Sequence, residues 1–189
     1  MPVVVRNVLA RRGCDTEHHA GERSLRQKEK GYSGAMFPWE SAWIEDGDVT
    51  PLYAGADVVT GKPTVVWSGI IEQHITADVA YGVWQYVQTT GDWEFMERYG
   101  YEMILEAARF WSSRLEWSDE DRHYHINDVI GADEYKEYCN DNSLTNYLVK
   151  WNLETALKCC AEQTVPERFR EKLELERFIP RSWIKERKR

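Results

Sequence analysis

The stretch IEQHITADVAYGVWQYVQTTG, residues 71–91, decides the fold. Its branched apolar side chains recur at steps of four, at Ile71, Ile75, Val79, Val83 and Val87. This spacing places them on one face of a helix and predicts a wide apolar stripe. The helix is expected to begin near Ser68 and to end at Gly91, because glycine commonly follows a helix terminus.

Helical patterns continue on the C-terminal side of this stretch. Asp92 is a suitable N-cap for a second helix at residues 93–117, whose apolar face matches the first. A third helix is expected at residues 141–163, and Pro166 fits the first turn of a fourth helix that ends before Pro180. The fold class predicted from this pattern is all-α.

Two other segments lack this helical periodicity. Residues 118–143 are polar, and the alternation of Tyr124 and Ile126 within them suits a short strand. Residues 46–67 contain three Gly and two Pro and are expected to form a loop, with TVVW at most a short strand. Residues 18–31 suggest a charged helix. The expected architecture is a helical array with long loops at one end.

The composition limits the class of function. The net charge is -8, and basic residues gather only in the final IKERKR, so a nucleic-acid partner is not expected. The N-terminal apolar run is too short for a signal peptide or a membrane span, which predicts a cytoplasmic protein without a membrane partner. Four cysteines without CxxC spacing are expected to be reduced. Nine Trp and ten Tyr hint at sugar binding, since aromatic faces stack on sugar rings.

The loop VIGADEYKE, residues 129–137, carries a cluster of acidic side chains. Cleavage of a glycosidic bond requires a carboxylic acid that keeps its proton at neutral pH. Clustered carboxylates beside aromatic rings favour such a protonated group. A simpler interpretation is that Asp133 and Glu134 cap the next element or face solvent, and spacing alone favours it.

Three other groups of residues are candidate sites. In FPWES, Trp39 presents an aromatic face beside the acceptor Glu40, which fits a sugar subsite, although a lone tryptophan is often a core residue. Glu72 and His74 are expected to point in different directions at a helix start and to make a poor metal pair. His123 and His125 lack a third ligand at a suitable spacing, so no metal site is predicted.

The runs GYSGAMFPWESA, EQHITADVAYGVWQYVQTTGDWEFMERYGYEMILEAARFWSSR, YHINDVIGADEYKE and DNSLTNYLVKWNLETA, in this order, resemble the central catalytic domain of glycoside hydrolase family 65. The family includes maltose, trehalose and kojibiose phosphorylases and related hydrolases. The resemblance covers about residues 31–161. It implies an (α/α)6 barrel and an inverting reaction in which inorganic phosphate attacks the anomeric carbon.

The resemblance also implies roles for individual residues. The family's acid motif, V-I-G-P-D-E-Y-H-E, places the general acid at Glu134, with Asp133 and Tyr135 orienting it. It places Trp39 and Glu40 at the glucosyl subsite and His74 near the pocket. Ala132 replaces the usual proline, and Lys136 replaces a histidine on the acceptor side, which changes the group expected to recognise the aglycone. No cofactor is implied, and phosphate is a co-substrate.

The length of the chain argues for an incomplete barrel, because twelve helices with their connections need well over ~200 residues. The expected domains are an N-terminal segment of uncertain match at residues 1–30, a partial catalytic barrel at 31–165 and a C-terminal helix with a basic tail at 166–189. The predicted function is an α-glucoside phosphorylase or hydrolase. The alternative is an inactive fragment that binds sugar weakly or acts as a helical interaction module, with exposed apolar stripes that favour a homo-oligomer.

Overall fold

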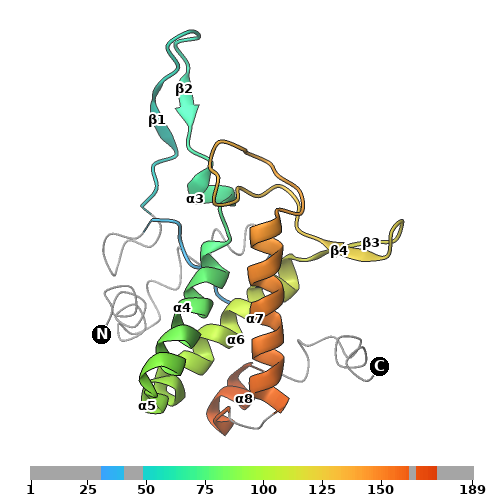
Figure 1. Cartoon of the computed structure of the whole chain (residues 1–189). Coiled ribbons are helices and arrows are strands. Elements are labelled where there is room, and N and C mark those ends of the chain that lie inside the picture. The colour runs from blue at the N-terminus through green and yellow to red at the C-terminus, as the bar shows by residue number, and fades with distance from the viewer. Residues whose placement is uncertain (1–30, 41–48, 162–164, 174–189) are drawn as a thin grey trace.

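The computed structural model of the chain describes residues 31–40, 49–161 and 165–173 (Figure 1). Its helices are α3 (Ser68–Ile71), α4 (Ile75–Thr90), α5 (Trp93–Phe95), the π-helical segment η1 (Met96–Gly100), α6 (Tyr101–Arg114), α7 (Ser143–Ala161) and α8 (Glu167–Leu173). Its strands are β1 (Tyr53–Ala56), β2 (Pro63–Val65), β3 (Glu116–Ser118) and β4 (His123–His125). The predicted mainly helical fold is confirmed for these residues, whereas its place as part of an (α/α)6 barrel stays a prediction.

The turn between α4 and the next helix forms as its sequence predicts. Gly91 ends α4 with a positive φ of 69°, a conformation that glycine adopts without strain. Asp92 then caps α5, because its Oδ1 accepts a hydrogen bond of 3.0 Å from the backbone N–H of Phe95. α5, η1 and α6 follow one another without a break and return antiparallel to α4.

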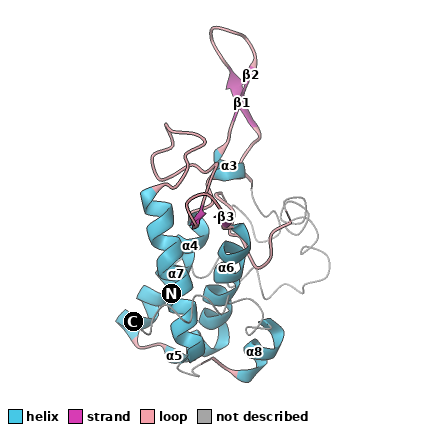
Figure 2. Cartoon of the chain, turned by 90° about the vertical axis from the view of Figure 1, so that its right-hand side faces the viewer, coloured by secondary structure: helices cyan, strands magenta, loops and turns pink. Residues whose placement is uncertain are grey.

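The core lies between α4, α6 and α7, which pack against one another (Figures 1 and 2). The predicted apolar stripe of α4 is buried at Val83 and Val87, together with Ala80, whereas Ile75 and Val79 are half-buried. Asn152 links α7 to α6, because its side-chain Nδ2 donates to the carbonyl of Ile104 in α6 over 3.2 Å. The N-termini of α4 and α7 and the C-terminus of α6 therefore lie at the same end of the bundle.

Several boundaries differ from the sequence-based expectation. The helix expected to run unbroken from Ser68 to Gly91 is interrupted between Ile71 and Ile75, so that α3 and α4 are separate helices. The second helix ends at Arg114, and Trp117 lies in β3 instead. Within residues 46–67, expected to be a loop with at most a short strand at TVVW, β2 overlaps that strand and pairs with the unpredicted β1 in an exposed antiparallel hairpin. The strand expected around Tyr124 is confirmed as β4, paired with β3.

Some expectations lie outside the described residues. These are the charged helix at residues 18–31, apart from Gly31, the part of the fourth helix beyond Leu173 and the basic tail. Cys14 also lies outside them, whereas Cys139, Cys159 and Cys160 form no disulfide bond with one another. Among the helices that the structure describes, none has the length and apolar character needed to cross a bilayer.

Candidate active site

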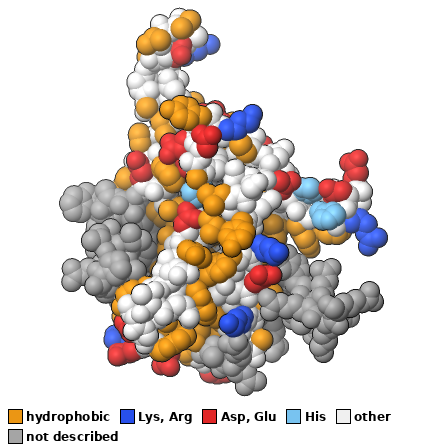
Figure 3. Space-filling view, in the orientation of Figure 1, with side chains coloured by type: hydrophobic (Ala, Val, Ile, Leu, Met, Phe, Trp, Pro, Cys, Tyr) orange, Lys and Arg blue, Asp and Glu red, His pale blue; other side chains and the backbone are white. Residues whose placement is uncertain are grey.

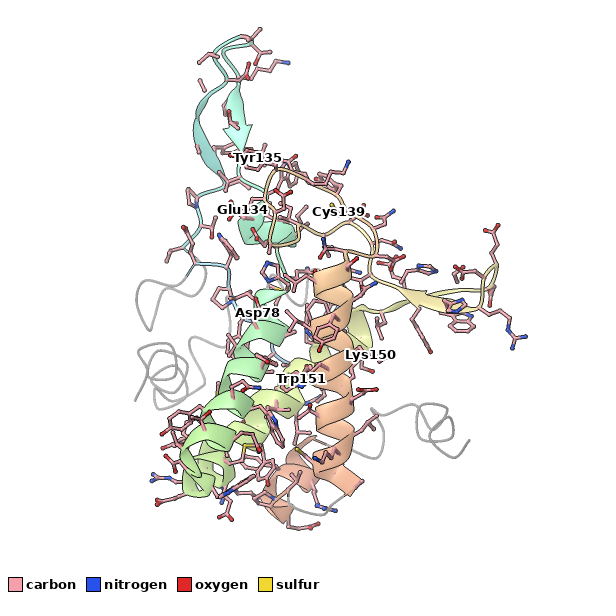
Figure 4. All side chains as sticks on the ribbon, in the orientation of Figure 1. Asp78, Glu134, Tyr135, Cys139, Lys150 and Trp151 are labelled. Atoms are coloured by element: carbon pink, nitrogen blue, oxygen red, sulfur yellow. The ribbon has the colours of Figure 1, made fainter. Side chains whose placement is uncertain are left out.

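The loop at residues 129–139, called the acid loop below, is closed at its base by backbone hydrogen bonds. Val129 and Cys139 exchange two of them, at 3.0 and 2.8 Å. The N–H of the next residue, Ile130, donates to the carbonyl of Ile71 at the end of α3 over 3.1 Å. The acid loop is therefore attached directly to the break between α3 and α4 (Figure 4).

Gly131 allows the acid loop to turn against the start of α7. A Cβ at this position would lie 2.3 Å from Nδ2 of Asn142, far inside normal contact. Asn142 cannot easily move aside, because its Oδ1 caps α7 by accepting from the N–H of Thr145 over 3.1 Å. The glycine between Ile130 and Ala132 is thus required by close packing at the base of the loop.

The predicted acid and its neighbours lie at the exposed end of this loop. Asp133, Glu134 and Lys136 are all exposed, and the side chain of Tyr135 is fully exposed. Asp133 shapes the turn, since its Oδ1 accepts from the N–H of Tyr135 over 3.2 Å. The structure thus places these four predicted site residues together at one end of the bundle, above the N-termini of α4 and α7 (Figure 4).

A buried histidine with two carboxylate partners lies below the acid loop. The Nδ1 atom of His74 is 2.6 Å from Oδ2 of Asp78, and its Nε2 is 3.3 Å from Oε1 of Glu72. The expectation that Glu72 and His74 point in different directions is therefore wrong. That expectation assumed a continuous helix, whereas the break after Ile71 turns Glu72 back toward the imidazole.

Burial changes the acid–base behaviour of this cluster. The side chain of Glu72 is wholly buried, and this desolvation raises its pKa to about 7, assisted by the negative charge of Glu134. The hydrogen bond from His74 opposes that rise. The pKa of His74 is raised by its hydrogen bond to Asp78, against the opposite effect of burial. The site thus contains one carboxyl group that titrates close to neutral pH.

Trp39 joins this cluster from the segment at residues 31–40. Its ring meets the imidazole of His74 edge to face, with the ring centroids 5.9 Å apart. The segment is held against α4 by a hydrogen bond of 3.0 Å from the N–H of Phe37 to Oγ1 of Thr76. Gly34 permits a close approach to α6, since a Cβ there would lie 2.4 Å from the carbonyl oxygen of Glu106.

Glu40, the remaining predicted sugar-binding residue, is exposed at the end of this segment. Its carbonyl accepts a hydrogen bond of 3.1 Å from the N–H of Val49. The structure therefore brings Trp39 and His74 into contact, and Glu40 follows Trp39 directly in the chain. The roles predicted for these residues in sugar binding stay predictions.

A buried arginine supports the break between α3 and α4. Nε of Arg114 donates to Oε1 of Gln73 over 3.0 Å, and Nη1 lies 2.6 Å from Oε1 of Glu116. Its Nη2 donates to the carbonyl of Asn127, just before the acid loop. Arg114 therefore ties the end of α6, the break and the start of the acid loop together.

Sequence reasoning did not identify the two partners of His74. Glu72 was not expected to contact the imidazole, and Asp78 was not considered. The four-residue spacing of His74 and Asp78 on α4 could have suggested their pairing. Among the described residues, no group of three His, Cys, Asp or Glu side chains is arranged to hold a metal ion.

Comparison with known proteins identifies similar sequences. A profile of the glycosyl hydrolase family 65 central catalytic domain matches residues 1–187, a wider range than the motifs quoted above. The chain is 51% identical over 150 residues to a kojibiose phosphorylase of Halothermothrix orenii, covering 79% of this chain and 19% of that protein. It is 40% identical over 129 residues to a kojibiose hydrolase of Flavobacterium johnsoniae, covering 68% of this chain and 17% of that protein.

A solved structure described as a kojibiose phosphorylase from the human microbiome has a similar fold, with a TM-score of 0.65 and 24% sequence identity. The similarity covers 82% of this chain and 21% of that chain. The chain thus spans about a fifth of the length of the proteins it matches.

Proposed function

This chain belongs to glycosyl hydrolase family 65, and on that premise we propose that it carries the general acid of an inverting α-glucoside phosphorylase or hydrolase. The observation that supports this proposal is the attachment of the acid loop to the break that holds Glu72 and His74. That attachment gathers a carboxylic acid, a buried titrating cluster and an indole face at one end of the bundle. Cleavage of a glycosidic bond requires a carboxylic acid beside the sugar, and an aromatic face is a common platform for a sugar ring.

Glu134 is the proposed general acid. Its carboxyl group donates a proton to the glycosidic oxygen while the bond from that oxygen to the anomeric carbon breaks, and the bonding electron pair stays on the oxygen. An oxygen of phosphate, or of water in a hydrolase, forms the new bond from the opposite face and inverts the configuration. Its exposed position on the acid loop leaves it open to a disaccharide.

The proposed sugar-binding residues surround this acid. Trp39 offers a face for the glucosyl ring, and its contact with His74 holds the indole in one orientation. Glu40 is an acceptor for sugar hydroxyls. Lys136, two residues beyond Glu134, is the proposed donor to the leaving sugar, and Asp133 and Tyr135 would orient the acid. Kojibiose is the first substrate to test, because the three similar proteins reported above are named for it.

The experiment incubates the wild-type chain and the Glu134→Gln variant with kojibiose, with and without inorganic phosphate, and measures the sugars released. Release of β-glucose 1-phosphate identifies a phosphorylase, and glucose release without phosphate identifies a hydrolase. The substitution should reduce turnover by about 10²- to 10⁴-fold, which is the usual contribution of a general acid. Glu137→Gln, on the same loop, is the matched control. Full activity of Glu134→Gln would contradict the assignment.

A second candidate function is a sugar-binding or interaction segment without turnover of its own. It is favoured by the apolar side chains exposed along α4 and α7, among them Tyr81, Leu144 and Tyr147. Figure 3 shows hydrophobic side chains gathered over this face. Such a face favours association with other apolar surfaces. Absence of turnover, together with concentration-dependent self-association in sedimentation experiments, would support this candidate.

A further inference from the structure

The returning limb of the acid loop contains a strained backbone position. Tyr138 has a positive φ of 53°, in the left-handed region that a bulky side chain rarely adopts. Asp128 and Asp141, which flank the loop, have similar values of 54° and 51°, but aspartate tolerates this conformation better. A strained residue persists only where the surrounding structure holds it, and such residues cluster at functional sites. The backbone at Tyr138 must therefore be held by contacts with its surroundings.

One such contact joins Tyr138 to Trp67 at the start of α3. The two rings meet edge to face, with their centroids 5.1 Å apart and 70° between the ring planes. This is a favoured arrangement of an aromatic pair. Trp67 is itself fixed, because its carbonyl accepts hydrogen bonds of 2.9 Å from the N–H groups of Ile70 and Ile71 in α3. Tyr138 thus packs against a side chain whose own backbone is anchored.

The ring contact is a second attachment of the acid loop to α3. On the outgoing limb, the N–H of Ile130 donates to the carbonyl of Ile71, the last residue of α3. On the returning limb, the ring of Tyr138 packs on Trp67. Residues 132–137 between these two points are all exposed, so burial does not fix their position. The two attachments therefore determine where this exposed part of the loop lies.

We propose that Tyr138 and Trp67 are positioning residues for the proposed general acid: their ring contact holds the acid loop on α3 and thereby fixes where Glu134 lies. This inference rests on the proposed role of Glu134, which is midway between Ile130 and Tyr138 in the sequence. A general acid must lie within hydrogen-bond reach of the oxygen that it protonates. Misplacement by about 1 Å can reduce turnover by about 10²-fold, so a residue that fixes the loop can act on the rate without touching the sugar.

The experiment measures the order of the acid loop by NMR and needs no substrate. The heteronuclear nuclear Overhauser effects of the backbone amides of residues 133–137 are compared with those of α7. Tyr138→Phe keeps the ring, Tyr138→Leu removes it, and Trp67→Leu removes the opposite ring without changing position 138. Tyr124→Leu is the matched control, because Tyr124 is 43% exposed against 45% for Tyr138 and also pairs with a tryptophan, Trp117, on the β3–β4 hairpin.

The acid loop is expected to be as ordered as α7 in the wild type, in Tyr138→Phe and in Tyr124→Leu. It should lose order in Tyr138→Leu and in Trp67→Leu while α7 stays ordered. A loop that is equally mobile in the wild type and in Tyr138→Leu would overturn the proposal, and so would a Tyr138→Phe variant that behaves like Tyr138→Leu. Loss of order that extends over α7 in both leucine variants would assign the ring pair a general structural role and would also overturn it.

Turnover provides a test that is separate from loop order. In a chain that cleaves kojibiose, Tyr138→Leu should reduce kcat by up to about 10²-fold with little change in KM, and Tyr138→Phe should retain the wild-type kcat. Full activity of Glu134→Gln would contradict the proposed function and leave the measured order of the loop unaffected. Conversely, an active chain whose kcat is unchanged in Tyr138→Leu would refute the positioning role alone.

Discussion

Two histidines of this chain have nearly the same partners and different surroundings. His74 lies between Asp78 and Glu72, and His125 lies between Asp141 and Asp121. In both, Nδ1 is 2.6 Å from an aspartate oxygen. The side chain of His74 is 7% exposed, and that of His125 is 26% exposed.

Because the two clusters differ in burial, the pKa of one carboxyl group is lowered in the His125 cluster and raised in the His74 cluster. The hydrogen bond from His125 lowers the pKa of Asp121, which is the usual result for an ion pair in water. Around His74, desolvation outweighs the same kind of hydrogen bond and raises the pKa of Glu72 to about 7. Burial, rather than the choice of partners, therefore allows a carboxyl group of the His74 cluster to titrate near neutral pH.

Removing each imidazole should produce the largest difference in stability between the two clusters. His74→Ala leaves the buried Glu72 and the half-buried Asp78 without their shared partner, and above pH 7 it should cost about 3 kcal/mol of unfolding free energy. His125→Ala removes more exposed ion pairs and should cost clearly less. Urea denaturation of both variants measures the difference. Equal losses would show that the two clusters are energetically equivalent.

The raised pKa values of Glu72 and His74 should make the stability of the fold depend on pH. The folded-state pKa of Glu72 lies above its ordinary value of 4.5, so its contribution to stability is present below that pH and is lost as the pH rises through about 7. The pKa of His74 is also raised from 6.5, so its contribution is likewise lost as pH rises through the higher folded-state value. The unfolding free energy should therefore fall from pH 4.5 upward.

Glu72→Gln tests this assignment. The variant should lose the part of the pH dependence that lies between 4.5 and about 7, a difference of up to about 3 kcal/mol. Glu137→Gln should retain it. Urea denaturation at a series of pH values gives the measurement, and a Glu72→Gln curve parallel to the wild type would assign the pH dependence to another group.

The smallest expected effect is on the two imidazoles themselves. Asp78→Asn should lower the pKa of His74, and Asp141→Asn should lower that of His125, because each removes the largest contribution that raises it. Asp78→Asn should also lower the pKa of Glu72, whereas Asp141→Asn should not. Proton NMR of the imidazole rings reports these shifts. A response of Glu72 to Asp141→Asn would mean that the two clusters communicate.

Local features of the fold were predictable from the sequence. The turn between α4 and α5 formed as expected, because Gly91 and Asp92 act on hydrogen bonds within a few residues of themselves. The strand at Tyr124 was also found, although its partner β3 was assigned to the preceding helix. Residues of the acid loop were recognised by their motif, and the structure places them together.

The break between α3 and α4 was not predictable in the same way. Ile71 and Ile75 keep the four-residue spacing of an unbroken stripe, so the pattern carries no signal of an interruption. The break is held by partners distant in the chain, namely Ile130, which bonds to Ile71, and Arg114, which bonds to Gln73. Glu72 was consequently assigned the wrong direction.

The sequence by itself determined the helical class, the turn at Gly91 and the family to which the acid motif belongs. These features depend on hydrophobic spacing, local capping and residue identity, all of which are properties of short stretches. Only the tertiary structure decided that Glu72, His74 and Trp39 meet below the acid loop and that Glu72 titrates near neutral pH. The physical reason is that desolvation and hydrogen bonding across a helix break depend on segments that meet only when the chain folds.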